Sequence, residues 1–225
     1  MVATRWQRGN VVEVRKLSAL FVVLRIAIPD RIGHLPGQHF VVRLTAEDRY
    51  TASRSYSIAS APHENLVELC VERLADGEVS NYLYDVIEVG DEIEVRGPIG
   101  GWFVWDGETP ALGVGGGSGV VPLVSMARHA RAIGRPELFT VLASARELDR
   151  LPYAEELISF GATVALTAAP AGRRLGPAEL VPGLRSAEIA FICGSAQFAE
   201  SISRMVVEEG FLESRVRVER FGPTG

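Results

Sequence analysis

The stretch Gly115-Gly116-Gly117-Ser118-Gly119-Val120-Val121-Pro122 decides how the second half of the chain is expected to fold. It lies between an apolar run and a helical pattern, so we expect a strand, a glycine loop and a helix in that order. Glycines let the backbone approach a pyrophosphate, whose charge the free N–H groups and the dipole at the helix N-terminus stabilise. Pro122 suits a first helical turn. Because Val120 replaces the third glycine of G-x-G-x-x-G, a glycine turn that binds nothing is the alternative.

Apolar runs continue to alternate with helical patterns after this loop. Strand–helix alternation predicts an α/β doubly wound parallel sheet with helices on both faces. The expected strands are 111–114, 138–143, 163–166, 189–193 and 216–218, and the expected helices are 120–133, 152–160 and 196–209.

The segments before the loop are short, β-branched and bounded by turn residues, which predicts an antiparallel β-barrel. Its expected strands are 11–17, 20–28, 39–44, 55–58, 66–73 and 92–96, with one inserted helix at 79–86. We therefore expect two domains, 1–104 and 105–225, which meet in the Gly/Trp-rich connection 97–107.

Composition argues against several classes of protein. A net charge of −5 is not that of a general nucleic-acid binder. Cys70 and Cys193 are the only cysteines, so we expect neither a disulfide framework nor a four-cysteine zinc or iron–sulfur site. The four histidines lack metal-ligand spacing, so no metal site is predicted. Neither a secretory signal nor a plausible membrane span is apparent, which predicts a cytoplasmic protein.

A second motif, Arg54-Ser55-Tyr56-Ser57, lies on one of the expected barrel strands. By itself it is explained by a strand with outward polar positions. Followed by a glycine loop that ends in proline, it resembles the ferredoxin–NADP reductase family. The resemblance covers nearly the whole chain and also rests on Pro36-Gly37-Gln38, Gly77-Glu78-Val79-Ser80, Cys193-Gly194 and Glu219-Arg220-Phe221-Gly222-Pro223.

The resemblance implies that the barrel binds FAD. Arg54 would pair with the FAD pyrophosphate, because a guanidinium matches phosphate oxygens bidentately. The helix that starts after Gly77 would offer N–H groups to the same pyrophosphate. Tyr56 would pack against the flavin, and Ser57 would hydrogen-bond N5, the atom that accepts hydride. Strand alternation places Tyr56 and Ser57 on opposite faces, so both reach one flavin only if the strand twists. The FAD ligands expected from this half are Arg54, Ser55, Tyr56, Ser57, Gly77, Val79 and Ser80.

The resemblance assigns the second domain to NAD(P)H. Cys193 and Gly194 follow an apolar strand at the sheet edge that binds ligands, and the family places this thiol beside the nicotinamide. A buried structural cysteine is the alternative. Phe221 resembles an aromatic that covers the flavin, or is a core aromatic. The expected nucleotide ligands include Gly115, Gly116, Gly117, Ser118, Gly119 and Pro122, and the catalytic candidates are Ser57, Cys193 and Glu219.

NADPH is favoured over NADH, because Ser144 and Arg146 follow the second expected strand and can bind a 2′-phosphate. Tyr153, further along the chain, could stack on adenine, and Arg173 and Arg174 are weaker phosphate candidates. Glu147 or Asp149 would instead hold the free ribose hydroxyl of NADH.

The expected function is hydride transfer from NAD(P)H to FAD, followed by release of single electrons to a separate ferredoxin or oxygenase component. The alternatives are a reductase that releases reduced flavin and a non-catalytic flavin-binding subunit. Residues 1–54 carry nine Arg/Lys and four Asp/Glu. An acidic electron carrier could dock there, at Arg43 and Arg49, although solvated arginines on exposed strands explain the same bias.

Overall fold

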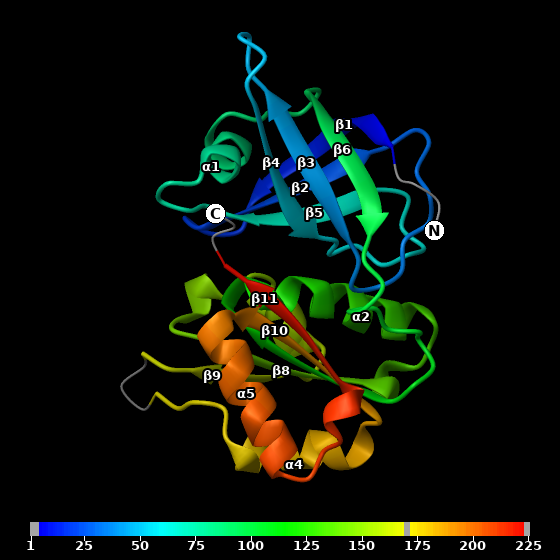
Figure 1. Ribbon diagram of the computed structural model, residues 1–225, viewed down its shortest axis with the longest axis vertical. Coiled ribbons are helices and arrows are strands. Elements are labelled where there is room, and N and C mark those ends of the chain that lie inside the picture. Colours follow the sequence, from blue (N-terminus) through cyan, green and yellow to red (C-terminus); the bar gives the residue numbers. More distant parts are fainter. Residues whose placement is uncertain (1–4, 169–171, 223–225) are drawn as a thin grey trace.

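Alternating apolar side chains fold the first half of the chain into an antiparallel barrel, seen as the upper domain of a computed structural model that describes residues 5–168 and 172–222 (Figure 1). Its six strands have the order β4-β3-β6-β1-β2-β5, and a bridge between Ile58 and Leu69 joins the two ends of this order. The barrel elements are β1 (Trp6–Lys16), β2 (Phe21–Ala27), β3 (His39–Thr45), β4 (Thr51–Ser57), β5 (Val67–Glu72), α1 (Glu78–Asp85) and β6 (Glu92–Ile99).

Strand β2 shows how the barrel is built and how it meets the second domain. Val22, Leu24 and Ile26 belong to the apolar cluster of the barrel. The alternate residues Phe21 and Val23 belong instead to a cluster shared with α2 (Val121–Ala132) and α3 (Ala154–Ser159) of the second domain. Because successive side chains of a strand point to opposite faces, β2 is buried on both sides.

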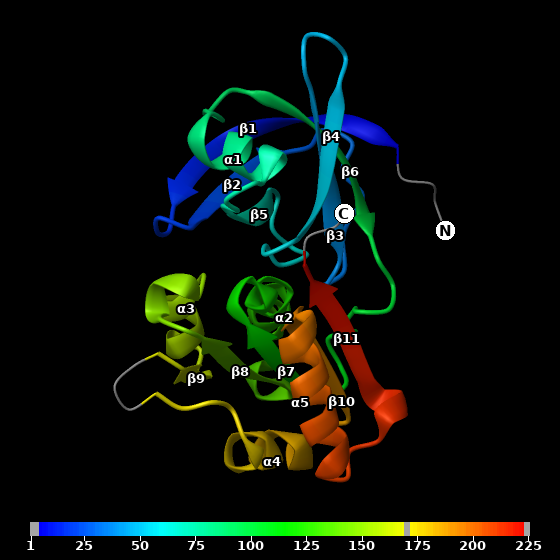
Figure 2. The ribbon, with the colours of Figure 1, turned by 60° about the vertical axis from the view of Figure 1, so that its left-hand side comes forward.

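The second half is a parallel five-stranded sheet with the order β11-β10-β7-β8-β9. Helices α2 and α3 pack on the face toward the barrel, and α4 and α5 pack on the other face (Figure 2). The elements are β7 (Ala111–Gly116), α2 (Val121–Ala132), β8 (Phe139–Ala145), α3 (Ala154–Ser159), β9 (Thr163–Leu166), α4 (Pro177–Ser186), β10 (Ile189–Ser195), α5 (Ala196–Glu208) and β11 (Val216–Phe221), with single-turn 3₁₀ helices at Gly117–Val120, Pro136–Leu138, Leu148–Arg150 and Glu213–Arg215.

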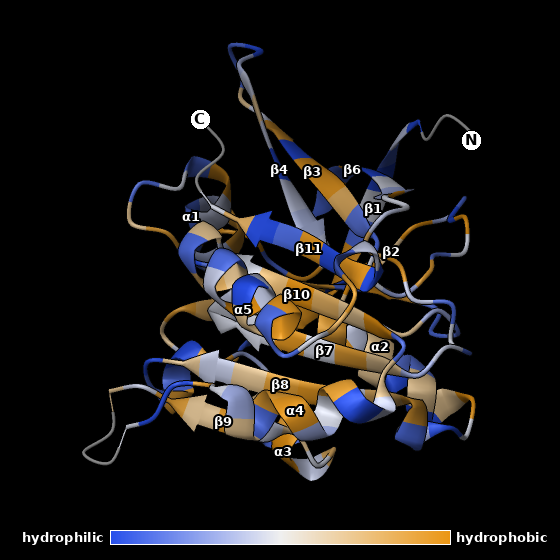
Figure 3. Ribbon diagram, turned by 60° about the horizontal axis from the view of Figure 1, so that its bottom comes forward, coloured by the Kyte–Doolittle hydropathy of each residue, from blue (hydrophilic) through white to orange (hydrophobic). Residues whose placement is uncertain are grey.

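Hydropathy follows position in this sheet. The central strands β7 and β10 are coloured hydrophobic, whereas the edge strand β11 is largely hydrophilic (Figure 3). Central strands of a doubly wound sheet are covered on both faces, and an edge strand is covered less completely.

The predicted fold class is confirmed: an antiparallel barrel precedes a doubly wound parallel sheet. Helix α4 was missed, because Pro182 lies inside it and prolines ordinarily end helical patterns. The boundary at 104/105 falls between β6 and β7 and remains a prediction. Pro223 and the first four residues lie outside the described residues. No helix in the described part of the chain is long and apolar enough to cross a membrane.

Candidate functional site

The glycine loop adopts the expected strand–loop–helix geometry. Gly117 has a φ of +55°, and a side chain there would meet no atom within 4 Å, so this turn is open. A methyl group at Gly119 would instead overlap the carbonyl oxygen of Cys193. Pro122 lies in the first turn of α2, as predicted. The loop therefore lies against the carboxyl end of β10, at the point where strand order reverses and α/β sheets form their ligand crevice.

Two ionisable candidates lie side by side at this crevice. Cys193 and Glu219 are register partners on β10 and β11. Burial, followed by the charge of Glu219, raises the pKa of the Cys193 thiol. Burial raises the pKa of Glu219 to about 7. Glu219 Oε2 is buried and has no hydrogen-bond partner among the described residues. The thiol thus stays neutral, whereas the carboxyl can take up or release a proton near neutral pH.

Strand β4 presents the flavin motif on the barrel. Arg54 and Ser55 are exposed, Tyr56 is half-buried against the barrel core, and Ser57 is buried. The Arg54 guanidinium donates to the carbonyl of Ser53 at 2.7 Å, and no carboxylate pairs with it within the described part of the chain. Its charge is therefore available to an anion.

Helix α1 packs beside β4 (Figure 1). Its first turn carries two of the predicted ligands, but their side chains are already used. Val79 is buried in the barrel core. The Ser80 hydroxyl donates to the carbonyl of Gly77 at 3.1 Å and accepts from Leu74 N at 3.3 Å. Only the backbone N–H groups of this turn remain for a phosphate, which agrees with the predicted kind of contact.

A pocket of about 230 Å³ lies where β8, β9 and β10 end. Ser144 lines it, as do Thr167 and Arg174, whereas Arg146 does not. Its full lining is Ser144, Thr167, Arg174, Leu175, Ser195, Gln197, Phe198, Ser201, Ile202 and Met205. The sequence analysis favoured Arg146 as the phosphate ligand, because that residue closely follows an expected strand. Arg174 comes from a connection whose course was not evident from the sequence.

The expectation that Tyr153 stacks on adenine was wrong. Tyr153 is 7% exposed, and its hydroxyl donates to Glu68 of the barrel at 2.8 Å. The guanidinium of Arg128 lies 5.1 Å from the centre of its ring. Tyr153 is therefore part of the contact between the two domains.

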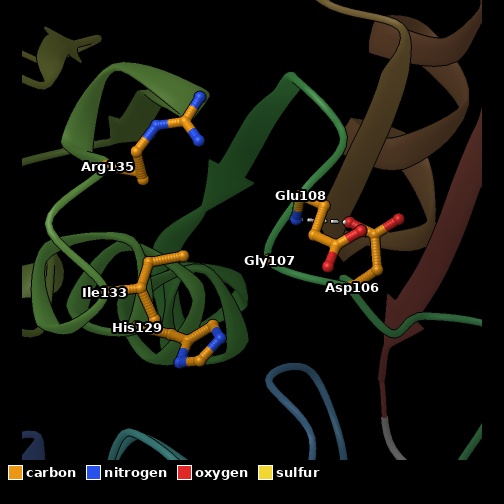
Figure 4. A pocket seen from close by; sticks show the side chains of 6 residues that line it. All are labelled: Asp106, Gly107, Glu108, His129, Ile133 and Arg135. Atoms are coloured by element: carbon orange, nitrogen blue, oxygen red, sulfur yellow. Dashed lines mark hydrogen bonds between the residues drawn. The ribbon is translucent and has the colours of Figure 1, made fainter.

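The larger pocket, about 580 Å³, lies at the opposite edge of the sheet, before β7 and β8 begin (Figure 4). It contains none of the predicted site residues. The carboxylate of Asp106 accepts from the backbone N–H groups of Glu108 and Thr109, both at 2.8 Å. Asp106 thereby stabilises the turn that enters the second domain.

The basic bias of residues 1–54 is largely compensated in space. Arg43 forms two hydrogen bonds of 2.9 Å with Glu94. Comparable ion pairs join Arg5 to Asp30, Arg8 to Glu92, Arg15 to Glu13 and Arg25 to Glu64. Several of these carboxylates come from later in the sequence, so the charge count of residues 1–54 overstated the bias.

Comparison with known proteins agrees with this architecture. Residues 8–104 match the family of oxidoreductase FAD-binding domains. A ferredoxin–NAD(P)(+) reductase component of a naphthalene 1,2-dioxygenase/salicylate 5-hydroxylase system from Ralstonia sp is 27% identical over 97% of this chain and 70% of that protein. The reductase component of propane 2-monooxygenase from Rhodococcus jostii is 30% identical over 68% of this chain. The chain spans only 42% of that second relative.

Solved structures share the complete fold. The FAD/NAD-binding domain of nitric oxide dioxygenase from Vibrio cholerae superposes with a TM-score of 0.85, at 22% identity, over 96% of this chain and 99% of that one. A ferredoxin NADP+ reductase from Neisseria gonorrhoeae, with bound FAD and NADP, gives 0.80 at 16% identity over 96% and 98%.

The barrel, the glycine loop and the crevice between them define a two-domain oxidoreductase that uses FAD and a pyridine nucleotide. Residues 8–104 match an oxidoreductase FAD-binding domain, and over its full length the chain is similar to ferredoxin–NADP reductases in sequence and fold.

Proposed function

We propose that this protein transfers hydride from NADPH to bound FAD and then passes single electrons to a separate acceptor, a ferredoxin or an oxygenase component. The observation that carries the proposal is the convergence of the glycine loop, Cys193 and Glu219 at one edge of the sheet, with the end of β11 directed at the barrel (Figure 2). Relatives named as reductase components of oxygenase systems support a separate acceptor.

The barrel residues fit a dinucleotide flavin. Arg54 lacks a carboxylate partner among the described residues, and the first turn of α1 beside it has unused N–H groups, so together they suit a pyrophosphate. Ser57 is buried and can donate its hydroxyl hydrogen to an atom on which negative charge develops. When bound, FAD supplies the hydride-accepting centre and the ability to release electrons one at a time.

The residues of the second domain bind and orient the nucleotide. The open turn at Gly117 and the N-terminus of α2 offer N–H groups to its pyrophosphate. Cys193 is a neutral, fully buried thiol, so it does not act as a nucleophile. Glu219 can hold a proton at Oε2 near pH 7 and thus connects the crevice to proton exchange.

Anaerobic reduction tests this proposal directly. The purified protein should retain FAD on gel filtration, NADPH should bleach the bound flavin, and a ferredoxin should reoxidise it. Recovery of FMN alone, or a flavin that neither NADPH nor NADH reduces, contradicts the proposal. Loss of flavin on dilution, together with turnover of free flavin, would identify a reductase that releases reduced flavin.

The preference for NADPH is expected to depend on Arg174, which lines the pocket beside Ser144, more than on Arg146, which does not line it. Removing a guanidinium that contacts the 2′-phosphate should lower kcat/KM for NADPH roughly tenfold or more and spare NADH. Arg146→Ala is the matched control. A larger loss of kcat/KM for NADPH in Arg146→Ala than in the Arg174 variant would show that the 2′-phosphate binds at the end of β8. If the unmutated protein prefers NADH, neither arginine binds a 2′-phosphate.

A further inference from the structure

Strand β5 presents a polar row to the second domain. Val67, Leu69 and Val71 point into the barrel core. The alternate positions Glu68, Cys70 and Glu72 therefore point out of the barrel, and Cys70 lies in the cluster shared with α2 and α3. Two carboxylates thus face the nucleotide-binding domain from one strand.

Glu68 is 4% exposed, yet its carboxylate is well satisfied. Its Oε1 accepts from Arg128 Nη1 and from the Tyr153 hydroxyl, both at 2.8 Å. Arg25 Nε lies 3.7 Å from Oε2. Both hydrogen bonds to Glu68 come from the other domain, so this buried charge depends on the way the two domains are docked.

Arg128 connects three segments at once. Its Nε and Nη2 donate to the carboxylate of Glu156 in α3 at 2.6 and 2.8 Å, and its Nη1 also donates to the carbonyl of Ala59 at 3.0 Å. Burial alone would lower the pKa of Arg128, but the hydrogen bonds with Glu156 and the charge of Glu68 raise it, so the guanidinium stays charged. We call Glu68, Arg128, Tyr153 and Glu156 the interdomain junction.

Burial of apolar area is non-directional, so the apolar contacts around the junction specify a rotation less strictly than hydrogen bonds of fixed geometry do. Buried ion pairs are often no more stabilising than apolar residues of the same volume, and their fixed geometry contributes specificity. A forked guanidinium that satisfies two carboxylates and a carbonyl permits few arrangements of the domains.

The same strand also contacts the glycine loop. The Ser118 hydroxyl donates to Glu72 Oε2 at 2.6 Å. Helix α2 begins directly after this loop, and Arg128 lies seven residues beyond Val121, about 10 Å along the axis. Strand β5 therefore holds the nucleotide-binding loop and its helix at two separate points, and two fixed points restrict how α2 can turn on the barrel.

We propose that Glu68 and Arg128 are positioning residues for hydride transfer: they fix the rotation of the nucleotide-binding domain on the barrel, and with it the gap between nicotinamide and flavin. This inference rests on the proposed function. Neither residue belongs to the crevice, so each acts through the placement of α2 and its loop. An error of about 1 Å in such a gap can lower the rate about 100-fold.

The kinetic test compares Arg128→Met, Arg128→Lys and Glu68→Gln in the FAD-loaded protein. In Arg128→Met the limiting rate of flavin reduction should fall roughly 10- to 100-fold, while the Kd for nucleotide changes by less than about threefold. Arg128→Lys should recover part of the rate, because lysine keeps the charge but not the fork. Arg204→Met removes an arginine from the exposed pair with Glu200 and should change nothing.

A second measurement reports domain orientation without any activity. Spin labels at Thr51→Cys in β4 and Glu208→Cys in α5 occupy exposed sites on the two domains, and both native cysteines are buried. The parent protein should give one narrow distance distribution, which Arg128→Met and Glu68→Gln broaden or shift and Arg204→Met does not.

The outcomes separate the two proposals. If NADPH and NADH both fail to reduce the flavin of the parent protein, the proposed function is wrong, while the label distances still decide whether the junction sets orientation. Unchanged distances in Arg128→Met and Glu68→Gln overturn the inference. The inference is also overturned if these two variants unfold more easily but keep the parent's limiting rate of flavin reduction. The junction would then contribute to stability alone. Should Arg128→Met fail to fold, Glu68→Gln, which keeps the shape of the side chain, decides both readouts.

Discussion

The candidate ligand-binding groups of the two domains differ in kind. The barrel offers an exposed guanidinium, Arg54, whose charge has no carboxylate partner in the described residues. The nucleotide-binding domain offers backbone and buried groups: the loop packed on Cys193 through Gly119, and Glu219 with its pKa raised by burial. Mutation of an exposed side chain can abolish binding without changing the core. Mutation of a buried acid, or of a glycine whose backbone forms the site, is expected to change stability as well. Mutations in the two domains should therefore differ in whether they change ligand binding or stability.

Removing the exposed charge should give the largest effect. Arg54→Ala is expected to weaken FAD binding by roughly 2–5 kcal/mol, because a desolvated phosphate loses its charge partner. The unfolding of the FAD-free protein should hardly change, since Arg54 is exposed. Fluorescence titration with FAD measures the first quantity and thermal unfolding of the apoprotein the second.

The matched control for Arg54 is Arg49→Ala, another exposed arginine near the β3–β4 turn, which should retain FAD. Unaltered FAD affinity in Arg54→Ala would show that Arg54 on β4 does not bind the FAD pyrophosphate.

The buried acid of the other domain should make stability depend on pH. Burial raises the pKa of Glu219 from 4.5 to about 7, so the folded state binds more protons than the unfolded state between those values. The stabilisation from the protonated form is therefore complete below pH 4.5 and is lost as pH rises through about 7. Relative to Glu219→Gln, the unmutated protein should lose up to about 3 kcal/mol of unfolding free energy across this window.

Urea unfolding at several pH values, at equal FAD loading, measures this difference. The exposed Glu213, just before β11, provides the control Glu213→Gln. Parallel pH curves for the parent and Glu219→Gln would mean that the carboxyl is hydrated in solution.

Ser57 is a buried candidate residue of the barrel, so its mutation can be compared with that of the exposed Arg54. Ser57→Ala removes the hydroxyl donor without adding bulk at this buried position, and the limiting rate of flavin reduction should fall roughly tenfold or more. Affinity for FAD should change much less, because this hydrogen bond matters most as charge develops. Stopped-flow reduction and an FAD titration separate the two effects, with the exposed Ser53→Ala as control. A normal rate with weaker FAD binding would leave Ser57 a binding residue only.

Local patterns were enough to predict the fold and the glycine loop. The loop is recognisable because its glycines, its flanking strand and Pro122 are contiguous, and the barrel because alternation repeats within each strand. The structure brings Cys193 and Glu219 together through the parallel pairing of β10 with β11. Their roles, like those of the other site residues, remain predictions.

What the sequence could not provide are contacts between distant segments. Tyr153 and Glu68 are 85 residues apart, and no local pattern pairs them. Glutamates at alternate positions of Val67–Glu72 ordinarily indicate a solvated outer face, whereas contacts with the second domain bury that face of β5. Arg174 was predicted to be only a weaker phosphate candidate, since its pocket is formed by the ends of three strands that are distant in sequence.

The smallest expected effect concerns docking of the acceptor, and it follows from the compensated charges of the barrel. Arg43 is held by Glu94 and stacks over Trp6 at 4.1 Å, so it offers little unpaired charge to a partner. Arg49 is exposed in the turn between β3 and β4. Electron transfer to an acidic ferredoxin should therefore slow only about two- to threefold between low and moderate ionic strength, since steering weakens when charges are paired and screened. Reduction of a small neutral quinone should ignore salt, and Arg49→Gln should flatten the salt dependence more than the exposed Arg135→Gln at the far edge of the second domain. Equal salt responses for ferredoxin and quinone would show that docking does not use the charge of the barrel.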